Sequence, residues 1–217
     1  MTLQHTRVTR SVGALSTLLI VLALALPASA QSRPPRVEIS GGYQWVKLFS
    51  DGESLTMPAG WYVDTAVNLT NVIAVVGQVS GNFKTESRHF DFEGLSFGVD
   101  SRTTVYEFMG GTRFHLRRSH AVAFAHVLAG AARAGGSATF QGDIPGLDPG
   151  MRTMEDFRTV FTFEVGGGVN LMLNHHVGVR AGVDYLHLFP PSEEHGSTGS
   201  GAGGLRLTVG VALAFGR

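Results

Sequence analysis

Long stretches in which apolar and polar side chains alternate strictly are the feature that most constrains the fold of this chain. After residue 36, seven stretches of about nine to thirteen residues have an apolar side chain at nearly every second position, as in residues 177–185 (Val-Gly-Val-Arg-Ala-Gly-Val-Asp-Tyr). A period of two predicts β-strands. Residues 120–133 complete a set of eight strands, but alanine lies on both faces there, so the sequence does not tell which face of that strand points inward.

The connections between these strands alternate in length. The long ones are rich in Gly, Pro, Ser and Asp and cover residues 48–59, 83–102, 134–156 and 190–202; the short ones cover about residues 69–71, 116–120 and 171–175. Successive strands joined in this way form an antiparallel meander with every long loop at one end. We therefore predict an all-β fold, an eight-stranded antiparallel up-and-down transmembrane β-barrel.

The polar face of the alternation carries charges of both signs and no lysine. An interior of eight strands is just wide enough for side chains, and buried charges must be paired. We predict a charge network inside the barrel made of Glu38, Asp64, Glu107, Arg113, Arg158, Glu164, Arg180, Asp184 and Arg206.

The apolar face ends in aromatic residues, as the lipid-facing wall of a membrane barrel does. The predicted aromatic girdle consists of Trp45, Trp61, Tyr106, Phe114, Tyr185 and Phe215. Strands of this length suit a bilayer better than a soluble sheet. The alternative is a soluble periplasmic ligand-binding barrel, in which the same apolar face lines a cavity.

The first thirty residues predict export. Arg7 and Arg10 precede an apolar run over residues 12–26, and Ala28-Ser29-Ala30 fits a signal-peptide cleavage site. We predict a signal peptide (1–30), a short N-terminal spacer (31–36) and an outer-membrane β-barrel domain (37–217), located in the cell outer membrane. Cysteine is absent, so disulfides contribute nothing to stability.

Two segments resemble the small outer-membrane β-barrel family, which includes the OmpA-type transmembrane domain and porin-like proteins. They are Gly110-Gly111-Thr112-Arg113-Phe114 with residues 123–130 (Ala-Phe-Ala-His-Val-Leu-Ala-Gly), and residues 163–169 with residues 177–185. The resemblance implies outer-membrane lipids and the outer-membrane assembly machinery as partners. The chain departs from the family in ending on Gly216-Arg217 after its terminal aromatic residue, Phe215.

No residue set predicts a catalytic, cofactor or metal site. His126 could act as a base, but an interior histidine bonded to the charge network is favoured, because no nucleophile stands in a matching context. Adjacent His175 and His176 point apart in an extended turn, and His187 and His195 flank a loop. The acidic residues Asp143, Asp148, Glu155 and Asp156 do not have the spacing of a calcium loop.

These observations favour a non-enzymatic protein with a structural or surface-interaction role. The long loop 83–102 carries Phe83, Phe90, Phe92, Leu95 and Phe97, interleaved with polar residues. Part of this loop is expected to extend the hairpin above the membrane, and its tip is a candidate site for a surface ligand. The net charge of zero gives no reason to expect nucleic acid, and a monomer is expected. The alternatives are a small-solute pore, a membrane-embedded lipid-modifying enzyme, and the soluble barrel described above.

Overall fold

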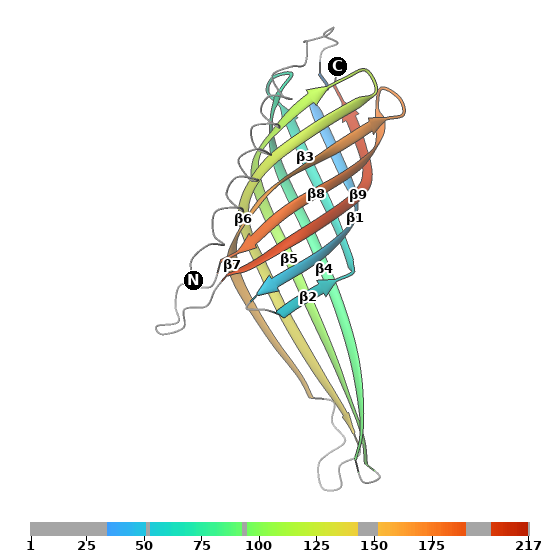
Figure 1. The fold of residues 1–217 in the computed structure, drawn as a ribbon, viewed down its shortest axis with the longest axis vertical. Helices are drawn as coiled ribbons and strands as arrows, with labels where there is room; N and C mark the ends of the chain where they lie inside the picture. The colour runs from blue at the N-terminus through green and yellow to red at the C-terminus, as the bar shows by residue number, and fades with distance from the viewer. Residues whose placement is uncertain (1–33, 51–52, 93–94, 143–151, 190–200, 217) are drawn as a thin grey trace, which may run out of the picture. The chain divides into compact units, whose positions relative to one another are not determined.

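A computed structural model describes residues 34–50, 53–92, 95–142, 152–189 and 201–216 (Figure 1). For residues 88–92, 95–99, 138–142 and 152–156 it describes the backbone alone. The predicted signal peptide, residues 31–33 of the spacer, and the residues Asp143, Asp148 and His195 lie outside the described residues.

The described residues form nine strands that follow the predicted alternation. They are β1 (Val37–Ser50), β2 (Glu53–Met57), β3 (Ala59–Asn68), β4 (Ile73–Phe92), β5 (Leu95–Arg117), β6 (Ala121–Gly142), β7 (Arg152–Met172), β8 (Val177–Leu188) and β9 (Ala202–Phe215). In this part of the chain, no helix is long and apolar enough to cross a membrane.

Pairing of the first and last strands closes the sheet into a barrel. From β3 to β9, each strand pairs antiparallel with the next, while β1 pairs with β3 on one side and β9 on the other. The β1–β9 register runs from Val37↔Phe215 to Phe49↔Gly203. Strand β2 is a short addition that pairs with the end of β1. The ring therefore has eight strands, β1 and β3–β9, which confirms the predicted fold class.

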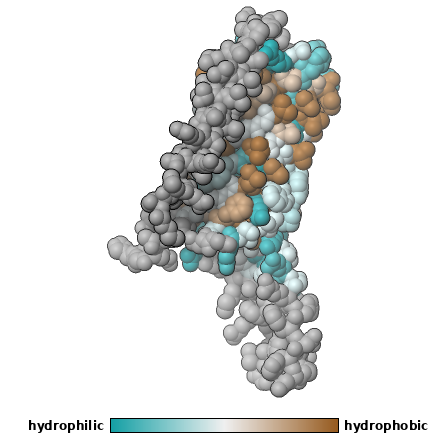
Figure 2. Space-filling model, in the orientation of Figure 1, coloured by the Kyte–Doolittle hydropathy of each residue, from teal (hydrophilic) through white to brown (hydrophobic). Residues whose placement is uncertain are grey.

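The side chains of the ring alternate between an exposed apolar outer face and a buried inner face. Outward residues such as Val63, Phe108 and Val209 are 45%, 56% and 51% exposed, although they are apolar. Figure 2 shows hydrophobic residues on the outer wall of the barrel. The structure also resolves the face of β6 that the sequence left open, since Phe124, His126 and Leu128 are buried inside.

Strands β4–β7 continue well past the closed ring, as expected for part of residues 83–102 but not for residues 134–156. Pairing of β4 with β5 reaches Phe92↔Leu95, and pairing of β6 with β7 reaches Phe140↔Arg152. In contrast, β3 pairs with β4 only as far as Phe83, and β8 pairs with β7 only from Thr162. Figure 1 shows the four strands extending beyond the others. We call this four-stranded extension, residues 84–92, 95–104, 134–142 and 152–161, the projecting sheet.

The loop boundaries 48–59, 83–102 and 134–156 were therefore wrong, because most of these residues are in strands. The long ladders of β4–β7 are possible because no proline interrupts these four strands. Proline has no N–H to donate and is excluded from paired strand interiors. The chain has no proline between Pro58, which separates β2 from β3, and Pro145, which follows β6. We call the end of the barrel near the projecting sheet the hairpin end, and the opposite end, with the three short connections, the turn end.

The predicted lipid-facing orientation has a measurable consequence for Val209, which lies midway along the outward face of β9. Val209→Arg should lower the free energy of unfolding in lipid vesicles by about 2–4 kcal/mol, because a cation at the bilayer midplane is costly. Leu173→Arg is the control, since Leu173 is 72% exposed in a short connection at the turn end and its change should cost at most about 1 kcal/mol. Equal costs in denaturant titrations would contradict the orientation.

Candidate functional site: the charged lumen

The barrel lumen contains a set of buried charged side chains that meet across it. The structure places eight of the nine residues predicted for the interior network on the inner face, each at most 4% exposed: Glu38, Asp64, Glu107, Arg113, Glu164, Arg180, Asp184 and Arg206. They come from six different strands, β1, β3, β5, β7, β8 and β9. Their contacts form three groups along the lumen, which lie near the hairpin end, in the middle and at the turn end.

Arg206 organises the group nearest the hairpin end. Its Nη1 donates to Glu164 on β7, and its Nη2 donates to Glu107 on β5, so one guanidinium on β9 spans the lumen. Ser80 Oγ donates to Glu107 Oε2 at 2.7 Å, and Gln78 Nε2 lies 3.4 Å from Glu164 Oε1. Charge-assisted bonds of this kind are what allow ions to be buried.

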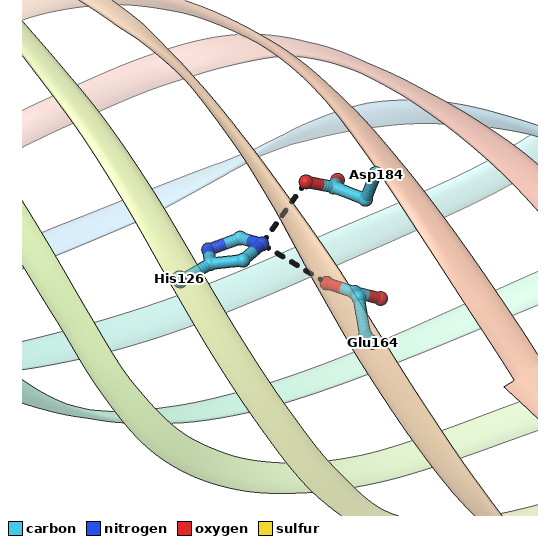
Figure 3. A group of neighbouring side chains, drawn as sticks. All are labelled: His126, Glu164 and Asp184. Atoms are coloured by element: carbon cyan, nitrogen blue, oxygen red, sulfur yellow. Dashed lines mark hydrogen bonds and ion pairs between the residues drawn. The ribbon is translucent and has the colours of Figure 1, made fainter. Parts of the chain in front are cut away.

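His126 extends this group to Asp184 (Figure 3). Its Nε2 lies 3.0 Å from Asp184 Oδ1 and 3.3 Å from Glu164 Oε1. Gly166 on β7 lies between these two residues in the sheet, because it pairs with His126 on β6 and with Asp184 on β8. Because Gly166 has no side chain, the imidazole and the carboxylate can meet above it.

The same three side chains have the chemistry of a metal site and lack that of a nucleophilic catalyst. One imidazole nitrogen and two carboxylate oxygens lie within 4.8 Å of one another, a donor set that suits Zn²⁺ or Mn²⁺. Arg206 already holds the other oxygen of Glu164, so the ion pairs account for the cluster without a metal. Among the described residues, the hydrogen-bond partners of His126 are carboxylates and not hydroxyls, whereas a serine-type mechanism needs a hydroxyl beside the base.

Asp64 organises the middle group. Arg113 binds it through two parallel bonds, Nη1 to Oδ1 at 3.0 Å and Nη2 to Oδ2 at 3.1 Å. Arg180 reaches it from the other side of the barrel and donates its Nε to Asn170 Oδ1 at 2.8 Å. The Phe124 ring lies beside both guanidinium groups, 4.8 and 4.6 Å from their central carbons, which gives each a cation–π contact.

Glu38 forms the group at the turn end. Arg117 Nη2 lies 2.7 Å from Glu38 Oε1 and 3.0 Å from Asn68 Oδ1. Asn68 in turn donates to Glu38 at 3.0 Å, and His115 lies beside Arg117. The group is partly open to solvent, since the Arg117 side chain is 22% exposed.

Arg158 does not belong to the lumen network, which corrects the prediction for this residue. It has the inward phase of β7 but is exposed, because the ring has ended there: pairing of β7 with β8 begins only at Thr162.

The prediction missed Arg117, which keeps the inward phase of β5 but was assigned to a turn. It also missed the neutral partners Ser80, Gln78 and Asn170, whose phase along their strands was the available signal.

An apolar layer covers the charged groups at the hairpin end of the lumen. Its members pack together although β1 and β5 lie on different sides of the barrel: Val46, Leu48, Leu55, Met57, Val105, Ala132, Ala134, Val160, Leu186 and Leu188. Strand β2 contributes Leu55 and Met57, so the short hairpin that it forms with β1 helps to close the lumen. The layer lies between the ion pairs and the projecting sheet, and Ala134 and Val160 at the base of that sheet belong to it.

The predicted girdle residues lie on the outer wall. Trp61, Tyr106, Phe114, Tyr185 and Phe215 are between 36% and 49% exposed, and Trp45 is half-buried. Among the described residues, the other histidines considered in the sequence analysis lie at opposite ends of the barrel. His175 and His176 are exposed in a short connection, whereas His187 packs edge-on against Phe189 at the hairpin end, 4.6 Å between ring centroids.

Removing the central cation should expose the energetic role of the network. Arg206→Met should destabilise the folded barrel by about 3–5 kcal/mol, because it leaves two buried carboxylates without their partner. Adding Glu107→Gln and Glu164→Gln should recover part of that loss. Arg118→Met is the control, since Arg118 is exposed in a connection. Denaturant unfolding in detergent measures all four proteins, and a harmless Arg206→Met would disprove a stabilising network.

Adding one methyl group at Gly166 should disrupt the contact between His126 and Asp184. A Cβ at Gly166 would lie 2.0 Å from Asp184 Oδ1 and 2.6 Å from its Cα, so Gly166→Ala should cost at least about 1–3 kcal/mol by overpacking. A Cβ at Gly77 meets nothing within 4 Å, so Gly77→Ala should be neutral or slightly stabilising. Similar unfolding midpoints for the two variants would contradict this account.

Several solved structures are similar to this chain. Two crystal structures of Ail, the attachment invasion locus protein of Yersinia pestis, are similar to this chain, each over 84% of it and 100% of Ail. The complex with the heparin analogue sucrose octasulfate has a TM-score of 0.55 at 16% identity, and the other structure 0.52 at 18%. Neisserial surface protein A gives 0.49 at 12% identity, over 85% of this chain and 100% of that protein.

Sequence comparison identifies the family. A comparison with curated protein sequences gives no significant match. The family model described as the outer membrane protein beta-barrel domain matches residues 16–215, which is nearly the whole chain. Together with the closed ring, its apolar outer wall and its charged lumen, this match shows that the chain belongs to the outer-membrane β-barrel protein family.

Proposed function

We propose that this protein is a non-enzymatic barrel that binds a ligand outside the cell through its projecting sheet. The observation that carries the proposal is the continued pairing of β4–β7 past the ring, to Phe92↔Leu95 and Phe140↔Arg152. In outer-membrane barrels the short turns face the periplasm and the long connections face outward. The projecting sheet would then stand above the membrane.

Backbone pairing makes the projecting sheet a suitable binding platform. A paired sheet loses less conformational entropy on binding than a flexible loop does. Its described side chains are polar, aromatic and charged, including the Lys84–Glu86 ion pair at 2.7 Å and Arg102, whose guanidinium carbon lies 5.9 Å from the centre of the Phe83 ring. Of these side chains, arginine and the aromatic residues are enriched at binding surfaces.

The filled lumen favours binding over transport. A pore needs a continuous path for water, whereas here Arg206 spans the ring between Glu107 and Glu164 and apolar side chains pack above it. Interior side chains of a barrel this size leave little room for a channel.

Ail was crystallised with a heparin analogue, which makes sulfated glycans a reasonable first class of ligand to test here.

We also infer that residues 1–30 are removed as a signal peptide, that the assembly machinery inserts the chain, and that the barrel is a monomer. N-terminal sequencing of the membrane-inserted protein tests the first of these inferences.

Trimming the projecting sheet should separate binding from folding. In the trimmed protein, Asn-Gly replaces residues 86–101 and residues 137–155, since a two-residue Asn-Gly turn suits an antiparallel hairpin. These cuts leave the pairs Thr85↔Arg102 and Gly136↔Asp156 to carry the new turns. We expect the trimmed protein to fold, shown by gel mobility that changes on boiling, but to lose binding to an array of sulfated glycans and matrix proteins.

Two outcomes would contradict the proposal. One is binding by the intact protein that survives trimming, which would place the site elsewhere. The other is a stable unit conductance of the intact protein in planar bilayers, which would show an open lumen. Arg118→Gln, at the turn end, serves as the control variant with an unchanged projecting sheet.

A further inference from the structure

Two arginines lie on the lipid-facing side of the wall, close to the aromatic girdle at the hairpin end. Arg102 shares the outward phase of β5 with Tyr106 and Phe108, and Arg133 shares that of β6 with Val127. Both arginines are exposed, and Arg133 is the direct cross-strand partner of Tyr106. Charged residues on this face are normally excluded from the hydrocarbon layer, so their depth must be that of the headgroups.

Each guanidinium is held against an aromatic ring. The central carbon of Arg133 lies 4.9 Å from the Phe157 ring centroid, and that of Arg102 lies 5.9 Å from the Phe83 centroid. Phe83 in turn packs edge-on against Tyr106, with ring centroids 5.9 Å apart. The two arginines and three rings therefore form one continuous outward band across β4–β7, which we call the arginine belt.

Stacking leaves the donor edges of the arginines available. A guanidinium that contacts a ring through its face keeps its N–H groups at the rim, where they match the oxygens of a phosphate in pairs. Among the described residues, neither Arg102 nor Arg133 forms an ion pair with a carboxylate. This differs from the lumen, where each buried arginine has an acidic partner.

The depth of the belt indicates the partner. Tyrosine and tryptophan of a girdle place their polar atoms at the headgroups, and Tyr106 with Trp61 belongs to the girdle on this side. The anions available at that depth are lipid phosphates, which attract basic side chains near the surface. We propose that the arginine belt binds phosphate groups of outer-leaflet lipid headgroups. Arg102 and Phe157 lie at the base of the projecting sheet, and the trimmed protein retains both. The proposal needs the membrane orientation but no ligand of the projecting sheet.

Binding of a phosphorylated lipid by the folded full chain tests the proposal. The probes are diphosphorylated lipid A and its dephosphorylated form, each added to phosphatidylcholine nanodiscs that contain the protein. We expect the diphosphorylated lipid to bind more tightly. Each of Arg102→Gln and Arg133→Gln should weaken its binding by about fivefold, and the double variant by more. Arg118→Gln at the turn end should leave binding unchanged.

Conservative variants separate the geometry from the charge. Arg102→Lys and Arg133→Lys retain the charge but lose the paired donors, so they should fall between the wild type and the glutamine variants. Gel mobility before and after boiling shows whether each lysine and glutamine variant is folded. Wild-type binding by the double glutamine variant, or equal binding of the two lipids, would overturn the proposal. So would displacement of the lipid by equimolar inorganic phosphate, since the site would then bind soluble anions.

Discussion

Backbone pairing in a medium without water is the constraint on which the rest of this structure depends. Each unpaired N–H or C=O in hydrocarbon is costly, so a sheet that spans a membrane must have no free edge. Pairing of β1 with β9 from Val37↔Phe215 to Phe49↔Gly203 meets this requirement. Closure then points every second side chain into a narrow interior. The polar and charged side chains there must find their hydrogen-bond and ion-pair partners without bulk solvent.

The lumen meets this second requirement with a few bridging arginines. Arg206 joins β5, β7 and β9, and Arg180 and Arg113 reach Asp64 from different strands. Such bonds tie strands that are far apart around the ring, and they specify the register because a shift by one residue would move every charge to the lipid side. Gly166 shows that small residues take part too, since its missing side chain is the space in which His126 meets Asp184.

Much of this could be predicted from the period of the sequence, because burial in a barrel wall depends on phase alone. Phase correctly gave the strands and the inward position of Glu164 and Arg206, and it failed for Arg158, where the alternation continues but the ring does not. The ring ends where β3 stops pairing with β4 and where β8 stops pairing with β7. The alternation within a single strand does not indicate where its neighbour stops pairing. Part of residues 83–102 was expected to extend the hairpin, but the rest of the projecting sheet was assigned to loops, because its glycines and polar residues also suit loops. Arg117 was missed because it lies where a strand and a turn meet.

The apolar layer around Val46 and Met57 divides the protein into two chemically separate halves. On one side lie ions whose partners are all supplied by the ring, and on the other lies a sheet held by its own backbone ladder. A change in sequence beyond the layer does not alter the dielectric surroundings of the ions beneath it. The barrel can thus serve as a carrier for foreign segments grafted onto β4–β7, and new surface specificities can arise there by substitution without redesign of the membrane-embedded half.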